Sequence, residues 1–305
     1  MNKDIRQSEN FAYYLSQIGW KIERIQGWNI FFRSFPLIGS LMKIQRVNKT
    51  LSLQKIDELA EKYRAFRVIL ELNTESPACH RLLPKAIVGG GIRNQELGKY
   101  GFKVSKNPHA PSKTIQVDLT PSEKQIFMQF EEAKRRGVRR AIKHRIIVKE
   151  SSDIEAFIKL KWGNDPFFFW LVKGNQLKLW QAFAPKNATV LFAYQNNHYD
   201  NIYYHSKHSS IPIAGILLLF YDKVAYYWQA AATREGKKLF APTLLVWEAL
   251  KLAKKRGCRI FDFEGIYDER FPSKTSEKWK GFTKFKQGFG GKEKYYPPPW
   301  FRSKF

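Results

Sequence analysis

The sequence predicts an α/β protein, because strands and helices alternate along most of the chain. The second half reads as three strands, a helix and a further strand, in the segments 188–195, 211–221, 223–232, 244–255 and 258–266. The first half offers a fainter version, with an amphipathic helix over 52–66 before the apolar strand 67–72. Such alternation is typical of α/β domains, and a length of 305 residues indicates about two of them.

The composition indicates a folded, strongly basic protein. Apolar residues make up 44% of the chain, and 9 Trp, 24 Phe and 14 Tyr are enough to fill a sizeable core. There are 53 Lys and Arg against 27 Asp and Glu, which gives a net charge of +26. That excess favours a polyanionic partner, either nucleic acid or an anionic membrane surface. A merely solvated basic surface is an alternative that charge alone leaves open.

Cysteines and apolar runs exclude several classes of protein. Cys79 and Cys258 share no metal-ligand spacing and suggest neither a disulfide framework nor a zinc site. The first ten residues lack the apolar core of a signal peptide. The longest apolar run, 211–220, is about half the length of a membrane span and reads as a buried strand. We therefore expect a cytoplasmic protein with no metal and no bound cofactor.

Capping patterns predict where three helices begin or end. Thr120 with Glu123, and Ser152 with Glu155, each have the spacing of a capping box. The helix 244–255 places its apolar residues on one face, and Gly257 predicts its end.

The first of these helices runs into a basic segment, 134–145, which carries seven Lys or Arg in twelve residues. At helical spacing four of its cations share one broad face: Arg136, Arg139, Arg140 and Lys143. This face could bind phosphates of a tRNA or a nucleotide diphosphate. It could equally be a solvated helix end, favoured by the helix dipole.

The segment 281–291, "GFTKFKQGFGG", raises a separate question. Taken alone it favours a strand that buries Phe282, Phe285 and Phe289, although the first two are three residues apart rather than two. The glycines at its end indicate a turn or a close backbone approach. Lys286 lies in the middle of this segment.

Three stretches carry a resemblance to a known family. They are "AGILLLFYDKVAYYWQAA", "APTLLVWEALKLAKKRGCRIFDFEGI" and "GFTKFKQGFGG", in this order and spacing. The chain resembles the FemABX family, the aminoacyl-tRNA-dependent peptidyltransferases of bacterial cell-wall synthesis. The segment "RQSENFAYYLSQIGW" suits the opening helix of that family. The resemblance covers most of the chain and is strongest over 211–291.

The resemblance implies two packed acetyltransferase-like (GNAT-type) domains, with mixed sheets flanked by helices. We expect the first over 1–148, with 292–305 returning to it, and the second over 149–291. It implies transfer of an amino acid from aminoacyl-tRNA to an amine of a peptidoglycan precursor, a nucleotide- or lipid-linked muropeptide. With it come two further expectations, a monomer and peripheral contact with the inner face of the membrane.

The resemblance also implies roles within the segment 281–291. Aminolysis of an ester requires a neutral amine, a place for the tetrahedral oxyanion and a route for one proton. A cation beside the ester carbonyl stabilises the developing negative charge. In the family such a cation belongs to a Phe-Lys pair, which here is Phe285 and Lys286. Phe285 would wall the site or stack on the terminal base, so that the segment closes the donor pocket.

Four more residues are candidates for substrate binding. Asp262 and Glu264 are two apart, so on a strand they share a face. One of them could accept a proton from the incoming amine, or both could pair with nearby cations. Tyr226 and Tyr227 alternate faces, and we place Tyr227 in the cleft. Gln229 stands at a position where the family has an aromatic or small residue. This departure from the family pattern makes it the fourth candidate.

Other departures concern the donor and the acceptor. Where a CoA-dependent acetyltransferase has its pyrophosphate cradle, this chain has Phe240 and Pro242, which argues against a CoA donor. The segment 161–180 lacks the Arg and Tyr that grip the acceptor in the family, and its aromatic run 167–170 also fits a core. Two alternatives therefore stay open: an N-acyltransferase for another small amine or sugar, and a non-catalytic basic module that binds RNA or a membrane surface.

Overall fold

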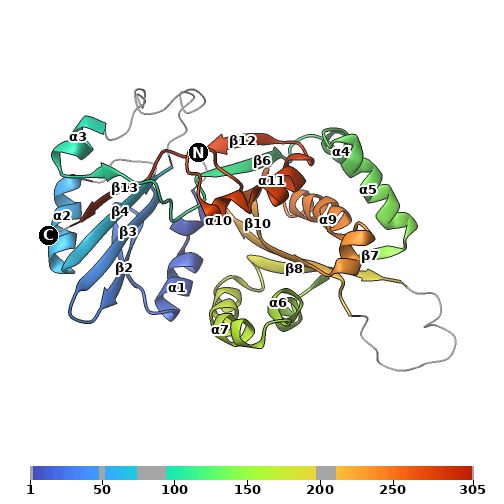
Figure 1. Ribbon diagram of the computed structural model, residues 1–305, viewed down its shortest axis with the longest axis horizontal. Helices are drawn as coiled ribbons and strands as arrows, with labels where there is room; N and C mark the ends of the chain where they lie inside the picture. Colours follow the sequence, from blue (N-terminus) through green and yellow to red (C-terminus); the bar gives the residue numbers. More distant parts are fainter. Residues whose placement is uncertain (1–2, 48–51, 74–93, 197–210, 304–305) are drawn as a thin grey trace. The chain divides into compact units, whose positions relative to one another are not determined.

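The computed structural model describes residues 3–47, 52–73, 94–196 and 211–303 (Figure 1). Cys79 lies outside these residues. The chain divides into two compact units, each built from several segments. Unit 1 comprises Met1–Thr114, Gly265–Lys280 and Glu293–Phe305, and unit 2 comprises Ile115–Glu264 and Gly281–Lys292.

Unit 1 is built on a mixed six-stranded sheet in the order β1-β2-β3-β4-β13-β5. Its strands are β1 Lys21–Ile25, β2 Trp28–Phe35, β3 Gly39–Val47, β4 Ala65–Leu72, β5 Lys103–Val104 and β13 Trp300–Ser303. β3 and β4 are parallel, whereas β13 runs antiparallel to β4 with Trp300 opposite Leu70. The last described strand of the chain therefore completes the sheet that the first strands begin.

The helices of unit 1 are short. They are η1 Ile5–Gln7, α1 Glu9–Gln17, α2 Leu53–Lys62, α3 Asn94–Lys99 and α10 Lys274–Glu277. The core places alternate residues of β2, Ile30 and Phe32, against Ile56 of α2 and Trp300 of β13. The sequence predicted this helix and the strand after it.

A mixed seven-stranded sheet follows the order β12-β6-β11-β10-β9-β8-β7 and forms the core of unit 2. Its strands are β6 Lys113–Asp118, β7 Ile146–Ser151, β8 Ala188–Gln195, β9 Ala214–Tyr221, β10 Val224–Ala232, β11 Ile260–Gly265 and β12 Lys292–Tyr295. β7, β8, β9 and β10 are joined in antiparallel pairs, and β10 and β11 are parallel. The two mixed sheets flanked by helices confirm the predicted fold class.

Helices cover both faces of this second sheet (Figure 1). They are α4 Glu123–Met128, α5 Glu132–Lys143, α6 Ile154–Trp162, α7 Pro166–Phe183, α8 Arg234–Lys238, α9 Ala241–Lys255 and α11 Lys280–Gln287. α9 packs on the strands of one face and carries α5 on its outer side, while α6 packs on β9 and β10 and carries α7. Gly215 of β9 allows α6 to pack closely on the strand, because a Cβ atom there would lie only 3.2 Å from Phe157 and Leu160.

The predicted helix starts need correction by one or two residues. The capping box that forms is Ser122 with Gln125, not Thr120 with Glu123. The Thr120 amide instead donates to the carboxylate of Asp118, which keeps Thr120 in a turn before the helix. Asp153, not Ser152, caps α6 by accepting from the amide of Ala156. The 120–143 segment also breaks into α4 and α5, because residues 129–131 form a turn between them.

Two further interpretations are wrong. The segment 281–291 is not a buried strand, because residues 280–287 form helix α11. The three-residue spacing of Phe282 and Phe285 was the helical signal. The aromatic run at the start of α7 is not core, since Phe167 is 74% exposed and Trp170 is 77% exposed.

The two units also divide the chain elsewhere than at residue 148, where the sequence placed the boundary. Unit 2 begins at Ile115, because β6 joins the second sheet and α5 packs against α9. The segment Gly265–Lys280 leaves unit 2 and belongs to unit 1.

Candidate functional site

The candidate site lies where β10 and β11 stop pairing. Their parallel register ends at Tyr226 and Asp262, although both strands continue. We call the stretch beyond this register, residues 227–232 of β10 and 263–265 of β11, the β10–β11 fork. Because no β10–β11 ladder joins these segments, main-chain groups and side chains from both faces of the sheet can meet there.

Helix α11 brings Lys286 to the fork. The side chain is only 7% exposed, and its ammonium donates a hydrogen bond of 2.7 Å to the main-chain carbonyl of Phe263. The same nitrogen lies 5.0 Å from the ring centroid of Phe282 and 5.6 Å from that of Tyr227. A buried cation is thus held by one carbonyl and two aromatic faces.

The surroundings of Lys286 favour easy loss of its proton. Burial lowers its pKa to about 8, because the charged form loses hydration. The carboxylates of Glu264 and Asp262 partly oppose this shift, and the positive charge of Lys161 adds to it. At neutral pH Lys286 is therefore a cation that is poorly solvated, as an oxyanion partner should be.

Lys161 was missed by the sequence reasoning. It comes from α6, on the other face of the sheet, and its ammonium donates to the carbonyl of Ala230 at 3.3 Å. It also lies 5.0 Å from the ring centroid of Trp162, and burial lowers its pKa to about 8. A signal was present, because Lys161 continues the buried stripe of Ile154, Phe157 and Ile158 at positions i, i+3, i+4 and i+7.

The two predicted carboxylates differ in setting. Asp262 is buried, accepts from the side-chain amide of Gln116 at 2.7 Å and from the Glu264 main-chain amide at 2.7 Å. Glu264 has φ of 57°, a left-handed conformation that costs about 1–3 kcal/mol in a residue other than glycine. The strand alternation assumed for this pair therefore breaks at Glu264. Asp262 holds the fork in shape, and Glu264 lies at its strained end.

The other two substrate-binding candidates lie on β10. A bulge between Tyr227 and Gln229 shifts the register of β10 against β9, as happens beside many active sites. The Tyr227 ring packs 5.6 Å from Phe263, and burial raises the pKa of its hydroxyl. The side-chain oxygen of Gln229 is buried and has no hydrogen-bond partner among the described residues. An unsatisfied buried acceptor suits a ligand that brings an N–H or O–H group.

Phe285 packs beside a lysine of α5. Its ring packs 5.1 Å from Phe289, and the ammonium of Lys134 lies 4.1 Å from its centroid. Phe282, one turn earlier on α11, has its ring centroid 5.0 Å from the Lys286 nitrogen. Phe285 therefore attaches α11 to α5.

The predicted phosphate-binding cations form an exposed row on α5. Arg136, Arg139, Arg140 and Lys143 are all exposed. Arg139 lies 3.5 Å from the carboxylate of Glu132, and Arg140 lies 5.4 Å from the ring centroid of Phe240. Because these side chains are exposed to solvent, they can bind an anion without any change in the protein core.

Phe240 and Pro242 stand at the N-terminus of α9, where a CoA pyrophosphate would have to sit. Phe240 is the N-cap residue with φ of 60°, and Pro242 provides no amide hydrogen. The Phe240 ring also reaches α5, because a Cβ atom on Gly137 would lie 3.5 Å from it. An aromatic ring and a proline thus occupy the positions that would have to donate amides to a pyrophosphate.

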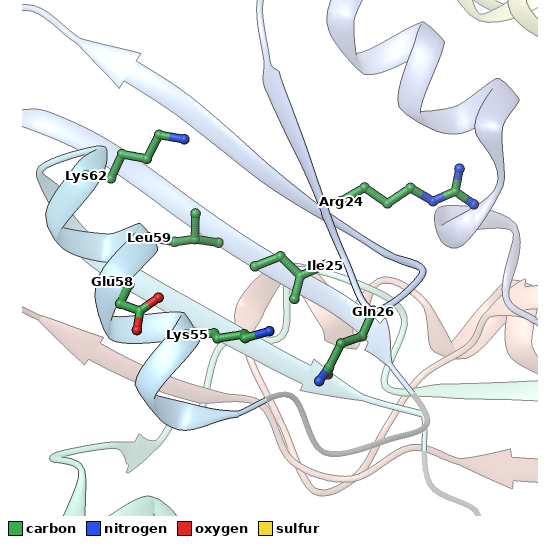
Figure 2. A pocket seen from close by; sticks show the side chains of 7 residues that line it. All are labelled: Arg24, Ile25, Gln26, Lys55, Glu58, Leu59 and Lys62. Atoms are coloured by element: carbon green, nitrogen blue, oxygen red, sulfur yellow. The ribbon is translucent and has the colours of Figure 1, made fainter.

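A separate hollow lies in unit 1 between the end of β1 and α2, with a volume of about 460 Å³ (Figure 2). Its lining is Arg24, Ile25, Gln26, Lys55, Glu58, Leu59 and Lys62. It contains none of the predicted site residues.

Comparison with known proteins assigns a family resemblance to the segment that contains the fork. Residues 192–296 match the model of the FemAB family, and this segment contains β9, β10, β11 and α11. The predicted resemblance to the FemABX family is confirmed. At the level of the family, the match supports a transferase of cell-wall synthesis. No curated protein matches the sequence.

Solved structures share the fold. The crystal structure of FemX is similar with a TM-score of 0.75 and 17% identity, covering 99% of this chain and 93% of that one. The C-terminal domain of a putative lysylphosphatidylglycerol synthetase from Agrobacterium fabrum has a TM-score of 0.56 and 11% identity, with 99% and 89% covered. A tandem GNAT protein from the clavulanic acid biosynthesis pathway has a TM-score of 0.50 and 9% identity, with 93% and 83% covered.

Two features are absent from the described residues. No group of three or more His, Cys, Asp or Glu side chains is placed there to hold a metal ion. Within the same residues, every helix is too short or too polar to cross a bilayer.

Proposed function

We propose that this protein transfers an amino acid from aminoacyl-tRNA to an amine of a peptidoglycan precursor. The observation that carries the proposal is the buried ammonium of Lys286 at the β10–β11 fork, within the segment that matches the FemAB family. An ester donor is already activated, so the reaction requires a positioned cation and a proton acceptor rather than a nucleophilic side chain.

The bond changes are simple. The nitrogen of the acceptor amine attacks the ester carbonyl carbon, and the carbonyl oxygen becomes an oxyanion. Lys286 donates a hydrogen bond to that oxygen in place of, or beside, its bond to the Phe263 carbonyl. The ester C–O bond then breaks, an amide forms, and the ribose oxygen leaves as a hydroxyl. Low solvent exposure around Lys286 strengthens this contact in the transition state.

The choice of a tRNA donor rests on two features of unit 2. The N-terminus of α9 carries Phe240 and Pro242, which disfavours a CoA pyrophosphate. Nearby, α5 presents an exposed row of cations that suits a phosphodiester backbone: Arg136, Arg139, Arg140 and Lys143. A non-catalytic binding module would use the same exposed cations but would not require the buried ammonium of Lys286.

The choice of a membrane-bound acceptor rests on α7. Its first two turns expose Phe167, Phe168, Trp170 and Leu171. Aromatic and aliphatic side chains of this kind insert at the boundary between headgroups and acyl chains, and the chain's net charge of +26 favours an anionic surface. We therefore propose peripheral contact with the inner membrane face and a lipid-linked muropeptide as the preferred acceptor.

The experiment presents one donor with three acceptors. Labelled aminoacyl-tRNA is incubated with the protein and a soluble nucleotide-linked muropeptide, a lipid-linked muropeptide in anionic vesicles, or phosphatidylglycerol vesicles alone. We expect label in the stem peptide, and more of it with the lipid-linked acceptor. Label in phosphatidylglycerol alone would refute the cell-wall assignment, and label in none of the three would refute aminoacyl transfer.

Membrane contact is tested separately by vesicle flotation. Replacing Phe167 and Trp170 by Ser should release the protein from anionic vesicles. The control replaces Met128 and Ile142, which are each 59% exposed on the α4 and α5 side of the same unit, and should leave binding unchanged. Equal loss in both variants would refute a specific role for α7.

A further inference from the structure

The buried-stripe lysine of α6, Lys161, has no role in the reaction proposed above. A lysine on the buried stripe of α6 takes the place of an apolar side chain, and among the described residues its ammonium contacts the Ala230 carbonyl and the Trp162 ring. It reaches the fork from α6, which packs on β10 and lies on the side of the sheet opposite to α11 (Figure 1). Lys286 and Lys161 are close enough that the charge of Lys161 acts on Lys286.

We propose that Lys161 is the proton acceptor of the aminolysis, and that Lys286 and Lys161 divide the work at the β10–β11 fork. Lys286 stays protonated and faces the oxyanion, whereas Lys161 is neutral and faces the incoming amine. The assignment rests on the proposed acyl transfer. It adds a second catalytic residue to it.

The different surroundings of the two amines decide which one carries the proton. The carboxylates of Glu264 and Asp262 both favour the charged form of Lys286, and its bond to the Phe263 carbonyl is short, at 2.7 Å. Burial lowers the pKa of Lys161, and its bond to Ala230 is longer, at 3.3 Å. The carboxylates and the shorter bond therefore favour a retained proton on Lys286 over one on Lys161.

The proton balance closes without another reagent. The acceptor amine enters neutral, its nitrogen bonds to the ester carbon, and one N–H proton passes to the neutral Lys161 nitrogen. When the ester C–O bond breaks, the ammonium of Lys161 gives that proton to the departing ribose oxygen. Lys161 ends as it began, a neutral amine, and the products are an amide and a tRNA hydroxyl.

The buried oxygen of Gln229 supports this direction of approach. Gln229 directly precedes Ala230, whose carbonyl holds Lys161, and its buried side-chain oxygen has no hydrogen-bond partner among the described residues. The acceptor amine has a second N–H available, which can bond to the Gln229 oxygen while the first is transferred. The acceptor should bind here as a neutral amine rather than as an ammonium, because two lysines already lie at the fork and would repel a further positive charge.

The kinetic test compares variants of Lys161 with a matched lysine on the same helix. Lys161→Ala should lower turnover about 10²–10⁴-fold, the usual contribution of a general base. Lys161→Arg should not restore it, since a guanidinium cannot release its proton. Small alkylamines should partly rescue Lys161→Ala, and more at higher pH as their free-base fraction rises. Lys159→Ala, an exposed neighbour, should retain wild-type turnover.

The pH profile gives a readout that a structural role would not change. In the wild type, activity should rise as Lys161 loses its proton and fall as Lys286 loses its own, with both limbs near pH 8. The rising limb should disappear in Lys161→Ala. Restored turnover in Lys161→Arg, or an unchanged rising limb in Lys161→Ala, would overturn the assignment.

A titration of the folded protein separates this proposal from the proposed function. In protein labelled with ¹³C at lysine Cε, the Lys161 signal, assigned by its loss in Lys161→Arg, should titrate near pH 8 and shift upward in Lys286→Met. A midpoint at the ordinary value of 10.5 would overturn the role of Lys161, whatever the donor is. Failure of wild-type transfer with a midpoint near 8 would instead refute the proposed reaction.

Discussion

Replacing Lys286 by Met tests the oxyanion role with little change of shape. Met keeps an unbranched side chain of similar length, which can still pack on the rings of Phe282 and Tyr227. It removes the hydrogen-bond donor that we place beside the oxyanion. Loss of one such donor typically lowers turnover about 10²–10³-fold, or about 2.7–4 kcal/mol.

The stability of this variant follows from two opposing contributions. A pKa lowered from 10.5 to about 8 means that the buried ammonium destabilises the fold at pH 7 by about 3 kcal/mol. Removing the lysine recovers that free energy, but it leaves the Phe263 carbonyl without this donor, which costs about 1–3 kcal/mol. We therefore expect the free energy of unfolding at pH 7 to change little.

The difference in the free energy of unfolding between the wild type and Lys286→Met should change with pH in one direction. Because the folded pKa of Lys286 is below the unfolded value, the unfolded chain binds more protons between about pH 8 and 10.5. The wild type should therefore gain stability relative to Lys286→Met as the pH rises through that window.

Single-turnover transfer and urea unfolding at several pH values measure both effects. Lys284→Met, an exposed lysine of the same helix, is the control and should retain activity. Unchanged turnover in folded Lys286→Met would refute the catalytic role. A stability difference independent of pH would refute the buried ammonium.

Three other predictions concern the donor and the fork. Replacing Arg136, Arg139 and Arg140 by Gln should weaken tRNA binding and reduce its salt slope by about one per lost contact; an unchanged slope would place the phosphates elsewhere. Glu264→Gly should raise the free energy of unfolding by up to about 1 kcal/mol by relieving a left-handed residue, yet lower turnover; a loss of stability would show that the Glu264 side chain outweighs the strain. Acetyl-CoA should not raise the thermal unfolding temperature, whereas a clear rise would indicate a CoA site.

The regular elements of unit 2 were predictable because their patterns are strong. The segment 188–195 is entirely β8, and the apolar face of 244–255 together with Gly257 predicted α9 and its end. The residue that caps α4 was harder to predict, because Thr120 and Ser122 each begin a sequence with the spacing of a capping box. The side chain of Asp118 decides between them by holding the Thr120 amide in a turn.

The segment 281–291 shows where short-range patterns mislead. Its aromatic residues and glycines are typical of strands and turns, whereas the phenylalanines, at positions i, i+3 and i+7, have helical spacing. Tertiary packing supports the helix, since the Phe289 ring packs on Phe130 and Phe263 and Lys286 reaches the Phe263 carbonyl.

The site was predictable in part. Lys286 was found through the family resemblance rather than through its own environment. Lys161 looked like an ordinary helix lysine, and its depressed pKa depends on packing that no local pattern reveals. The bulge before Gln229 and the left-handed Glu264 likewise arise from how β10 and β11 part. Sequence therefore located the strands of the site, and the structure located its amines.

The central claim is that the donor is a tRNA ester, and pretreatment of the donor with RNase tests it most directly. Label is followed from a mixture of aminoacyl-tRNAs into lipid-linked muropeptide, with intact donor, with RNase-treated donor, and with acetyl-CoA as the sole donor. We expect transfer from intact donor alone, because cleavage of the tRNA removes the polyanion that α5 is proposed to bind. Acyl transfer from acetyl-CoA that persists after RNase would contradict the claim.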